Sequence, residues 1–293
     1  MDQGDDGLTN QRYQRLVWLT GHLTTHPDQQ LSLTELSRKF GVAKSTLSDD
    51  LLMVKTAMDE TRLGTVDTQV GSQGGVVFSP QLDGEAVEKT LEFWLHALSE
   101  PDRRTPEGFL YMTDLLFDPK RIDPLGQLLA ENFRHMAVDG VATVETKGIP
   151  LAMATAERLG VGVMLLRRDS RLSDGSALSL NYLSGSSHRI QSMSLSRRMP
   201  ARGARLIFVD DFMKAGGTAR AAQDLLTEFD ARVIGVGVLI STREPEHKLI
   251  EDYVACLQWN ESEKSGPPLQ VSGWVNELVR RSHLGFGGGP GGT

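Results

Sequence analysis

Apolar and polar positions in the second half of the chain change repeatedly between strand-like and helix-like spacing. Four short apolar runs predict buried strands, at residues 140–144, 161–166, 206–209 and 233–240. Amphipathic stretches that predict helices follow the first and the third of these runs, at 149–159 and 219–229. Strands that alternate with helices are typical of a parallel sheet with helical crossover connections. The pattern therefore predicts an α/β fold for this half of the chain.

The first half of the chain has apolar residues at helical spacing, followed by two short extended segments. Helical repeats lie at 13–26, at 33–40 and from 43–45 to Met58, and a capping box of Ser32 and Glu35 precedes the second repeat. Gly41 separates the second repeat from the third, as in a helix-turn-helix. Strands predicted at 64–70 and 76–79 flank a glycine-rich turn. These elements together predict a winged helix-turn-helix.

These patterns divide the chain into three parts. A winged-helix domain is expected over residues 1–79, with the Asp- and Gly-rich residues 1–7 disordered. A second domain follows over 80–282; it opens with an amphipathic linker helix at 81–99 and contains a further helix at 124–137. The glycine-rich residues 283–293 are predicted to form a flexible tail. Gly235 and Gly237 lie inside a predicted strand, so we interpret them as packing glycines and not as a dinucleotide-binding motif.

The third apolar run leads into Asp210, Asp211 and a glycine-containing loop that ends at Thr218. The two acids lie where parallel sheets bind ligands, and carboxylates suit ribose hydroxyls or a shared Mg²⁺ ion. Residues 215–218 precede a helix, and their glycines let the backbone approach a phosphate closely. The stretch 206–218 indicates a sugar phosphate as ligand, and it resembles the signature of phosphoribosyltransferases. A buried strand with a glycine turn and surface acids is the alternative.

A second loop, at residues 146–148, also lies between a predicted strand and a predicted helix. Lys147 offers a positive charge and Gly148 a close backbone approach. Phosphoribosyltransferases hold the pyrophosphate of phosphoribosyl pyrophosphate (PRPP) with a loop of this kind. The alternative is a surface lysine ahead of a helix.

Residues 170–196 contain ten serines, and Met193 and Leu195 alternate with serines at strand spacing. The alternation predicts a long hairpin that forms a flap over the site, with low-complexity disorder as the alternative. Phe212 and Phe109 are candidate stacking platforms for a base, or else core residues. The residues predicted to bind PRPP are Asp210, Asp211, Phe212, Lys214, Ala215, Gly216, Gly217, Thr218, Thr146, Lys147 and Gly148, and those of the flap are Tyr182, Ser184 and Arg189.

Composition limits the class of protein. Of 293 residues, 39% are hydrophobic and 24% are charged, which is ordinary for a globular protein. The one cysteine, Cys256, excludes an internal disulfide and fits a reducing compartment. No apolar run approaches the roughly 20 residues that span a bilayer, and no signal peptide opens the chain. We therefore expect a cytoplasmic protein with no membrane partner.

The winged helix is the candidate for binding double-stranded DNA, although its charge is balanced. Residues 8–70 contain seven basic and seven acidic side chains, and the whole chain has a net charge of −7. A small basic face near the start of the third helix is compatible with these totals. The alternative is a helical dimerisation or ligand-relay domain. The residues predicted to contact DNA are Arg12, Arg15, Arg38, Lys39, Lys44, Ser45 and Thr46.

Residues 43–49, 146–151, 181–191 and 210–218 together resemble the purine operon repressor family of Gram-positive bacteria. The resemblance implies an N-terminal winged helix-turn-helix plus a C-terminal type I phosphoribosyltransferase-like parallel-sheet domain. It also implies a homodimeric repressor of purine biosynthesis genes, with no catalytic residues, that is released from operator DNA by PRPP.

The same resemblance implies that Mg²⁺ accompanies PRPP at Asp210 and Asp211. Guanosine tetraphosphate or another purine nucleotide would compete for the phosphate sites. Two alternatives stay open at the level of sequence. One is an active purine phosphoribosyltransferase with a fused regulatory domain, and the other is an RNA-binding attenuator.

Overall fold

The computed structural model of the chain describes residues 4–69, 74–104, 110–168, 177–183, 190–196, 202–260 and 268–285. Two units make up the chain, Met1–Asp83 and Gly84–Thr293, and each has its own hydrophobic core. The division between them lies close to the boundary predicted after residue 79.

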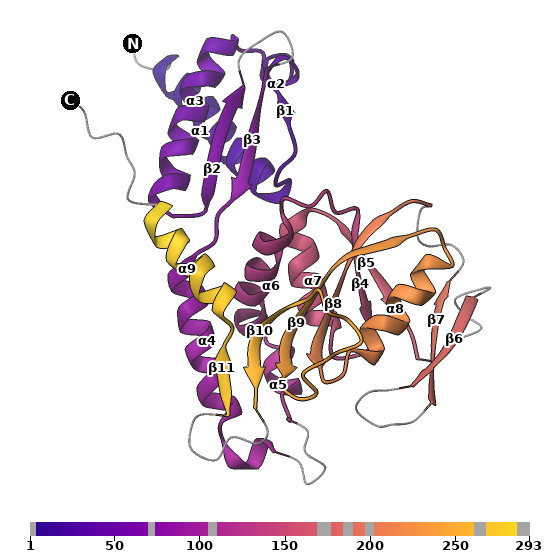
Figure 1. Cartoon of the computed structure of the whole chain (residues 1–293). Helices are drawn as coiled ribbons and strands as arrows, with labels where there is room; N and C mark the ends of the chain where they lie inside the picture. The colour runs from indigo at the N-terminus through magenta and orange to yellow at the C-terminus, as the bar shows by residue number, and fades with distance from the viewer. Residues whose placement is uncertain are drawn as a thin grey trace. The chain divides into compact units, whose positions relative to one another are not determined.

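The first unit combines three helices with a small antiparallel sheet (Figure 1). Its helices are α1 (Gly4–Thr25), α2 (Leu33–Phe40) and α3 (Lys44–Glu60). Its strands are β1 (Leu31–Ser32), β2 (Gly64–Gln69) and β3 (Gly75–Pro80), in the sheet order β1-β3-β2. Strands β2 and β3 pair along their whole length as a hairpin. The predicted winged helix-turn-helix is confirmed.

Local capping fixes the turn between α2 and α3. The Ser32 side chain accepts a hydrogen bond from the Glu35 backbone N–H at 3.4 Å, as the predicted capping box requires. Gly41 ends α2 with φ of +64°, a conformation that favours glycine. The Ser37 hydroxyl donates to the carbonyl of Val42 at 2.6 Å across the turn. These bonds set the direction in which α3 leaves the turn.

Apolar residues from all three helices and the sheet form the core of the first unit. Leu19, Leu47 and Val76 are fully buried there. Tyr13 and Val17, which the sequence pattern placed on the apolar side of α1, are instead 61% and 74% exposed. Helix α1 also begins at Gly4, so it covers part of the segment predicted to be disordered. That segment has no apolar repeat, so periodicity gave no sign of a helix there.

The second unit is built on a six-stranded sheet in the order β11-β10-β9-β8-β4-β5 (Figure 1). The parallel strands are β4 (Gly140–Val144), β5 (Gly162–Leu166), β8 (Arg205–Met213), β9 (Arg232–Thr242) and β10 (Val254–Trp259). Strand β11 (Leu269–Val271) adds an antiparallel edge. The predicted parallel α/β sheet is confirmed, with β10 and β11 as strands that the sequence analysis had not identified.

Helices cover both faces of this sheet. They are α4 (Gly84–Leu98), the 3₁₀ turn η1 (Pro101–Arg103), α5 (Thr113–Leu116), α6 (Pro119–Phe133), α7 (Ile149–Leu159), α8 (Gly217–Thr227) and α9 (Gly273–Gly285). Helix α8 packs on the face that carries Phe208 and Val236, whereas α6 meets the opposite face at Gly235 and Gly237. Among the described residues, no helix has the length and apolar character needed to cross a membrane.

The predicted flap is present as a two-stranded antiparallel hairpin, β6 (Ala177–Leu183) and β7 (Ile190–Ser196). Two backbone hydrogen bonds between Arg167 and Ser194, of 2.9 and 2.7 Å, join β7 to the chain just after β5. Leu195 and Met193 are buried in the cluster that also contains α8. The hairpin is therefore anchored to the second unit at its β7 strand.

The boundaries that differ from the predicted ones include those of α6, β8 and α9. Helix α6 begins at Pro119 and not at Pro124, because Asp118 caps it by accepting the Lys120 N–H at 3.0 Å. Strand β8 continues through the acidic pair to Met213, since β9 pairs with it over that length. Helix α9 extends to Gly285 and so includes three residues of the predicted tail.

Gly235 and Gly237 lie against α6, which confirms them as packing glycines. A Cβ atom at Gly235 would lie 2.6 Å from the ring of Phe133, a side chain that is only 3% exposed. The enclosed ring cannot move away without disturbing the core.

We expect Gly235→Ala to lower the free energy of unfolding by about 1–3 kcal/mol through overpacking. Gly162→Ala is the matched control, because Gly162 is also a strand residue of this sheet and a Cβ atom there has nothing within 4 Å. Urea unfolding followed by circular dichroism measures both. Equal stabilities of the two variants would contradict the packing role.

Candidate functional site

The chain changes direction in the sheet between β4 and β8. From β4 it crosses through α7 to β5 at one edge, whereas from β8 it proceeds through α8 to β9 on the other side. Ligands of open α/β sheets bind at such a switch point, outside the carboxyl ends of the strands. The pairing of β4 with β8 ends at Ala142 and Phe208, ahead of the acidic pair. A cavity of about 610 Å³ opens there.

Both predicted phosphate-handling loops border this cavity. Every residue predicted to bind PRPP lines it except Gly148: Thr146, Lys147, Asp210, Asp211, Phe212, Lys214, Ala215, Gly216, Gly217 and Thr218. Gly148 lies directly behind the lining. A Cβ atom there would overlap the Thr143 hydroxyl and lie 2.7 Å from Asp210 Oδ1. Glycine at 148 thus allows the loop after β4 to approach the acidic pair of β8.

The acidic pair is held in a poorly solvated position. Asp210 is 8% exposed, and its Oδ1 accepts the backbone N–H of Asp211 at 2.9 Å. Burial raises the pKa of Asp210 well above its usual value, and the charge of Asp211 raises it further. Burial also raises the pKa of Asp211, whereas the Asp210 hydrogen bond and the charges of Lys147 and Arg168 oppose that rise. A cation or a set of hydroxyl donors in the cavity would stabilise the ionised pair.

The loop ahead of α8 offers backbone donors to an anion. Gly216 has φ of +80°, and α8 begins at the next residue. Within the part of the chain that the structure describes, the N–H groups of residues 215–218 have no acceptor. Unpaired N–H groups at a helix N-terminus, next to a cavity, are suited to a phosphate. This agrees with the role that the sequence predicted for the loop.

Part of the cavity lining is apolar. Leu110, Met112 and Val238 line it together with Phe212. The Phe212 ring packs edge-on against Trp259, with ring centroids 5.8 Å apart. Phe212 therefore combines a packing contact with a surface toward the cavity, while Phe109, the other candidate platform, lies outside the described residues.

Ten lining residues were not among the predicted site residues: Leu110, Met112, Val144, Glu145, Arg168, Gln191, Phe208, Met213, Ala219 and Val238. Gln191 is on β7, and its side-chain oxygen accepts the Tyr182 hydroxyl at 2.9 Å. Tyr182 therefore contacts a lining residue, whereas the predicted flap residues Ser184 and Arg189 lie outside the described residues. Arg168 follows β5 at the same sheet edge, a position that the Arg-Arg strand end could have signalled. Leu110 and Met112 come from a distant segment with no motif.

The predicted DNA contacts fall into two groups in the first unit. Arg38, Lys39, Lys44 and Ser45 are exposed around the turn between α2 and α3, and Thr46 is half-buried. Helix α3 has Ala43 at its N-cap with no side-chain cap, and the N–H groups of residues 44–46 have no acceptor among the described residues. Such a helix start is suited to contact a DNA phosphate.

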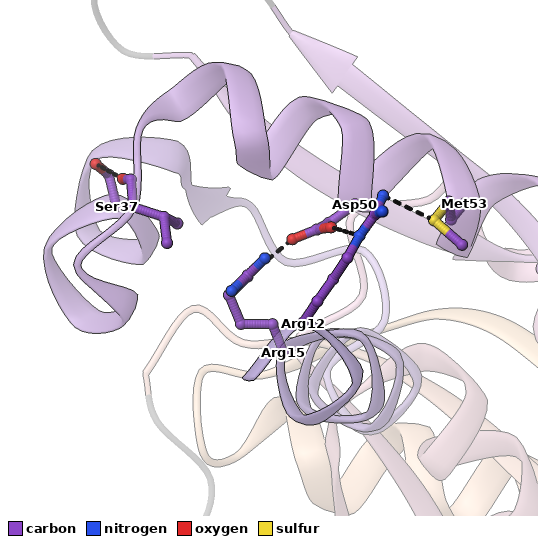
Figure 2. A network of polar contacts seen from close by, with 6 residues as sticks. Arg12, Arg15, Ser37, Asp50 and Met53 are labelled. Atoms are coloured by element: carbon purple, nitrogen blue, oxygen red, sulfur yellow. Dashed lines mark hydrogen bonds and ion pairs between the residues drawn. The ribbon is translucent and has the colours of Figure 1, made fainter. Parts of the chain in front are cut away.

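Arg12 and Arg15 lie elsewhere, in an ion-pair network with Asp50. Figure 2 shows both side chains directed at this carboxylate, which is completely buried on α3. Arg15 Nε lies 2.8 Å from Oδ2, and Arg12 Nε lies 2.9 Å from Oδ1. Arg15 is 8% exposed, so its side chain is a link between α1 and α3 and contributes little to the exposed basic surface. No sequence pattern signals this network, because in the sequence alone an aspartate at a core position looks like a surface acid.

Two family models match the chain, one for each unit. Residues 11–80 match the model described as "Bacterial purine repressor, N-terminal". Residues 113–270 match the phosphoribosyl transferase domain.

Curated relatives extend across both units. The Bacillus subtilis purine biosynthesis transcriptional repressor PurR is 41% identical over 243 residues, which cover 83% of this chain and 85% of the relative. The Lactococcus lactis purine biosynthesis transcriptional activator PurR is 39% identical, covering 84% of this chain and 91% of the relative.

A solved structure agrees with the fold of the second unit. The adenine phosphoribosyltransferase of Thermoanaerobacter pseudethanolicus superposes with a TM-score of 0.50 at 24% identity, covering 56% of this chain and 99% of the enzyme. This likeness concerns the fold alone.

Removal of different members of the Asp50 network should lower the stability of α3 by very different amounts. Asp50→Ala leaves the buried Arg15 guanidinium unpaired, so the opening free energy of α3 should fall by about 3–5 kcal/mol. Arg12→Ala is the control, because the Arg12 side chain is 46% exposed and its loss should cost about 1 kcal/mol or less. Amide hydrogen exchange of α3 in the full-length protein measures both. A small, equal effect of the two substitutions would refute the structural role.

Proposed function

Because this chain belongs to the bacterial purine repressor family, as a transcriptional regulator of purine biosynthesis, we propose that it represses its target genes as an operator-bound homodimer. PRPP, bound in the second unit, relieves the repression. The repressing direction follows the name of the Bacillus subtilis relative, while the Lactococcus lactis relative is named an activator.

The cavity at the β4–β8 switch point is the observation that carries the ligand assignment. It combines a carboxylate pair, a loop with a lysine and a loop of unpaired backbone N–H groups. PRPP has matching groups: two ribose hydroxyls, a pyrophosphate and a 5′-phosphate. In the proposed complex Asp210 and Asp211 bind the ribose, Thr146 to Gly148 bind the pyrophosphate, and Ala215 to Thr218 bind the 5′-phosphate.

The acidic pair fits Mg²⁺ that arrives with PRPP. Gly148 packs so closely against Asp210 Oδ1 that a side chain at position 148 would not fit beside that oxygen. Burial also disfavours two adjacent carboxylate charges that no cation compensates. Hard oxygen ligands are those that Mg²⁺ prefers, and it commonly shares them with substrate phosphates. The ion would neutralise charge between the carboxylates and the pyrophosphate, while Lys147 and Arg168 add positive charge from the protein.

Dimerisation compensates for the balanced charge of the first unit. Seven basic and seven acidic residues between positions 8 and 70 give a single copy little general attraction for DNA. Two copies that bind two half-sites double the number of phosphate and base contacts. We assign these contacts to the α2–α3 turn and the start of α3, with Arg15 excluded because it is buried against Asp50.

We further propose that the second unit senses PRPP without transferring its ribose. The relatives that match both units are named as regulators, whereas the Oenococcus oeni xanthine phosphoribosyltransferase, 28% identical, covers 58% of this chain. A purine nucleotide with several phosphates, such as guanosine tetraphosphate, would occupy the same anion sites and favour the repressing state.

The first test is a gel shift on DNA from upstream of purine biosynthesis genes. PRPP with Mg²⁺ should weaken binding by at least about tenfold, the size of an ordinary allosteric coupling. Asp210→Asn, which removes a charge but little volume, should bind the operator as the wild type does and lose the response to PRPP. Lys55→Ala, in the first unit, is a control that should keep the response.

An unchanged gel shift with PRPP in the wild type would refute the effector assignment. Formation of a radiolabelled nucleotide from purine and PRPP, with release of pyrophosphate, would instead support the enzyme. Expression of purine genes in a deletion strain gives the direction of regulation, because loss of a repressor raises it and loss of an activator lowers it.

The exposed start of α3 generates a prediction on the DNA side. Lys44→Ala should weaken operator binding and reduce the slope of log affinity against log salt by about one, as expected when one phosphate contact is lost. Lys55→Ala, three turns further along the same helix, should leave the slope unchanged. Equal slopes for both variants would remove Lys44 from the interface.

A further inference from the structure

A buried lysine, Lys248, lies behind the phosphate loop and belongs to none of the groups assigned above. The residue is 9% exposed, and its ammonium donates to the carbonyl oxygens of Lys214 and Pro245, the latter at 3.1 Å. The Thr242 hydroxyl lies 3.5 Å from the ammonium. Among the described residues, no carboxylate forms an ion pair with it.

Burial disfavours the charged form and lowers the pKa of Lys248; the charge of Glu244 opposes this shift, and the charge of Lys214 adds to it. An apolar side chain of similar length would avoid the burial of a charge, but it would take away the donor of the Lys214 and Pro245 carbonyls. The burial of this charge is therefore better explained by an effect of Lys248 on the loop that borders the cavity than by packing alone.

Three consecutive backbone carbonyls, those of residues 214, 215 and 216, are each held by a hydrogen-bond donor. Lys248 holds the carbonyl of Lys214, and Thr242 Oγ1 lies 3.3 Å from the same oxygen. The backbone N–H of Leu249 donates to the carbonyl of Ala215 at 2.9 Å, and that of Arg220 donates to Gly216 at 2.9 Å. Each of these three carbonyls thus has a defined partner before any ligand binds.

These carbonyl contacts determine where the N–H groups point. In a trans peptide the C=O of one residue and the N–H of the next lie on opposite sides of the peptide plane. The bonds to residues 214, 215 and 216 therefore direct the N–H groups of residues 215, 216 and 217 the other way, and these are groups that have no acceptor among the described residues. Residues 215–217 line the cavity.

We propose that Lys248 is a positioning residue for the phosphate site: it holds the Lys214 carbonyl so that the Ala215 N–H faces the cavity, and it places a positive charge behind a bound phosphate. This proposal rests on the proposed binding of PRPP. A loop set in its binding conformation by Lys248, Leu249 and the first turn of α8 loses little entropy when the ligand arrives.

Isothermal titration with two partial ligands tests the proposal in the full-length protein. Ribose 5-phosphate requires the loop at 215–218, whereas pyrophosphate requires the loop at 146–148. Lys248→Met should weaken ribose 5-phosphate by about tenfold, as expected for a lost charge-assisted hydrogen bond, and change pyrophosphate by less than about twofold. Lys248→Arg keeps charge and donors and should restore most of the affinity. Thermal melts establish that each variant is folded.

Each other outcome overturns the proposal. Wild-type affinity of Lys248→Met for ribose 5-phosphate, or an equal loss for both ligands, would remove the positioning role. If Lys248→Met does not fold, Lys248→Gln gives the same comparison under the same criteria. Failure of the wild type to bind both PRPP and ribose 5-phosphate would refute the proposed function itself, and it is seen before any variant is compared.

Discussion

Desolvation of two adjacent carboxylates is the constraint on which the ligand site depends. Asp210 and Asp211 lie where the pairing of β4 with β8 has ended, while β9 still pairs with β8, and both acids line the cavity that opens on the unpaired side. Within the protein, their opposing charges come from Lys147 and Arg168, on loops after neighbouring strands. The pair is therefore incompletely compensated until a cation or a polyhydroxyl ligand arrives, and this favours a role in binding.

In the proposed complex, the two loops would bind anions by different means. The loop after β4 relies on a lysine and on a glycine that brings it against Asp210. The loop after β8 relies on backbone N–H groups whose carbonyl partners are already engaged behind it. A side chain adapts to its ligand, whereas a fixed backbone selects one shape.

Sequence reasoning identified the winged helix, the parallel sheet and both loops, because each has a local signal: a capping box at Ser32, apolar runs, and glycines beside acids. It missed features that depend on contacts between distant segments. Asp50 and the two arginines appear as surface charges until α1 packs on α3. Lys248 lies in a segment without a motif and acquires its place only when residues 242–250 fold behind the phosphate loop. Helix α6 shows a third limit, since Pro119 and Pro124 are competing start signals.

The shared carboxylate of Asp50 has a consequence for how this family diverges. Two guanidinium groups on successive turns of α1 bind its two oxygens separately, so a lineage can lose the outer arginine and still keep the inner link. Loss of the aspartate leaves both arginines without their carboxylate partner at once. Positions 12 and 15 should therefore vary one at a time among homologous sequences wherever aspartate stays at 50, and an apolar residue at 50 should appear only where both arginines have been replaced. The residue at position 50 would then follow the residues at positions 12 and 15, and not the exposed residues of the α2–α3 turn.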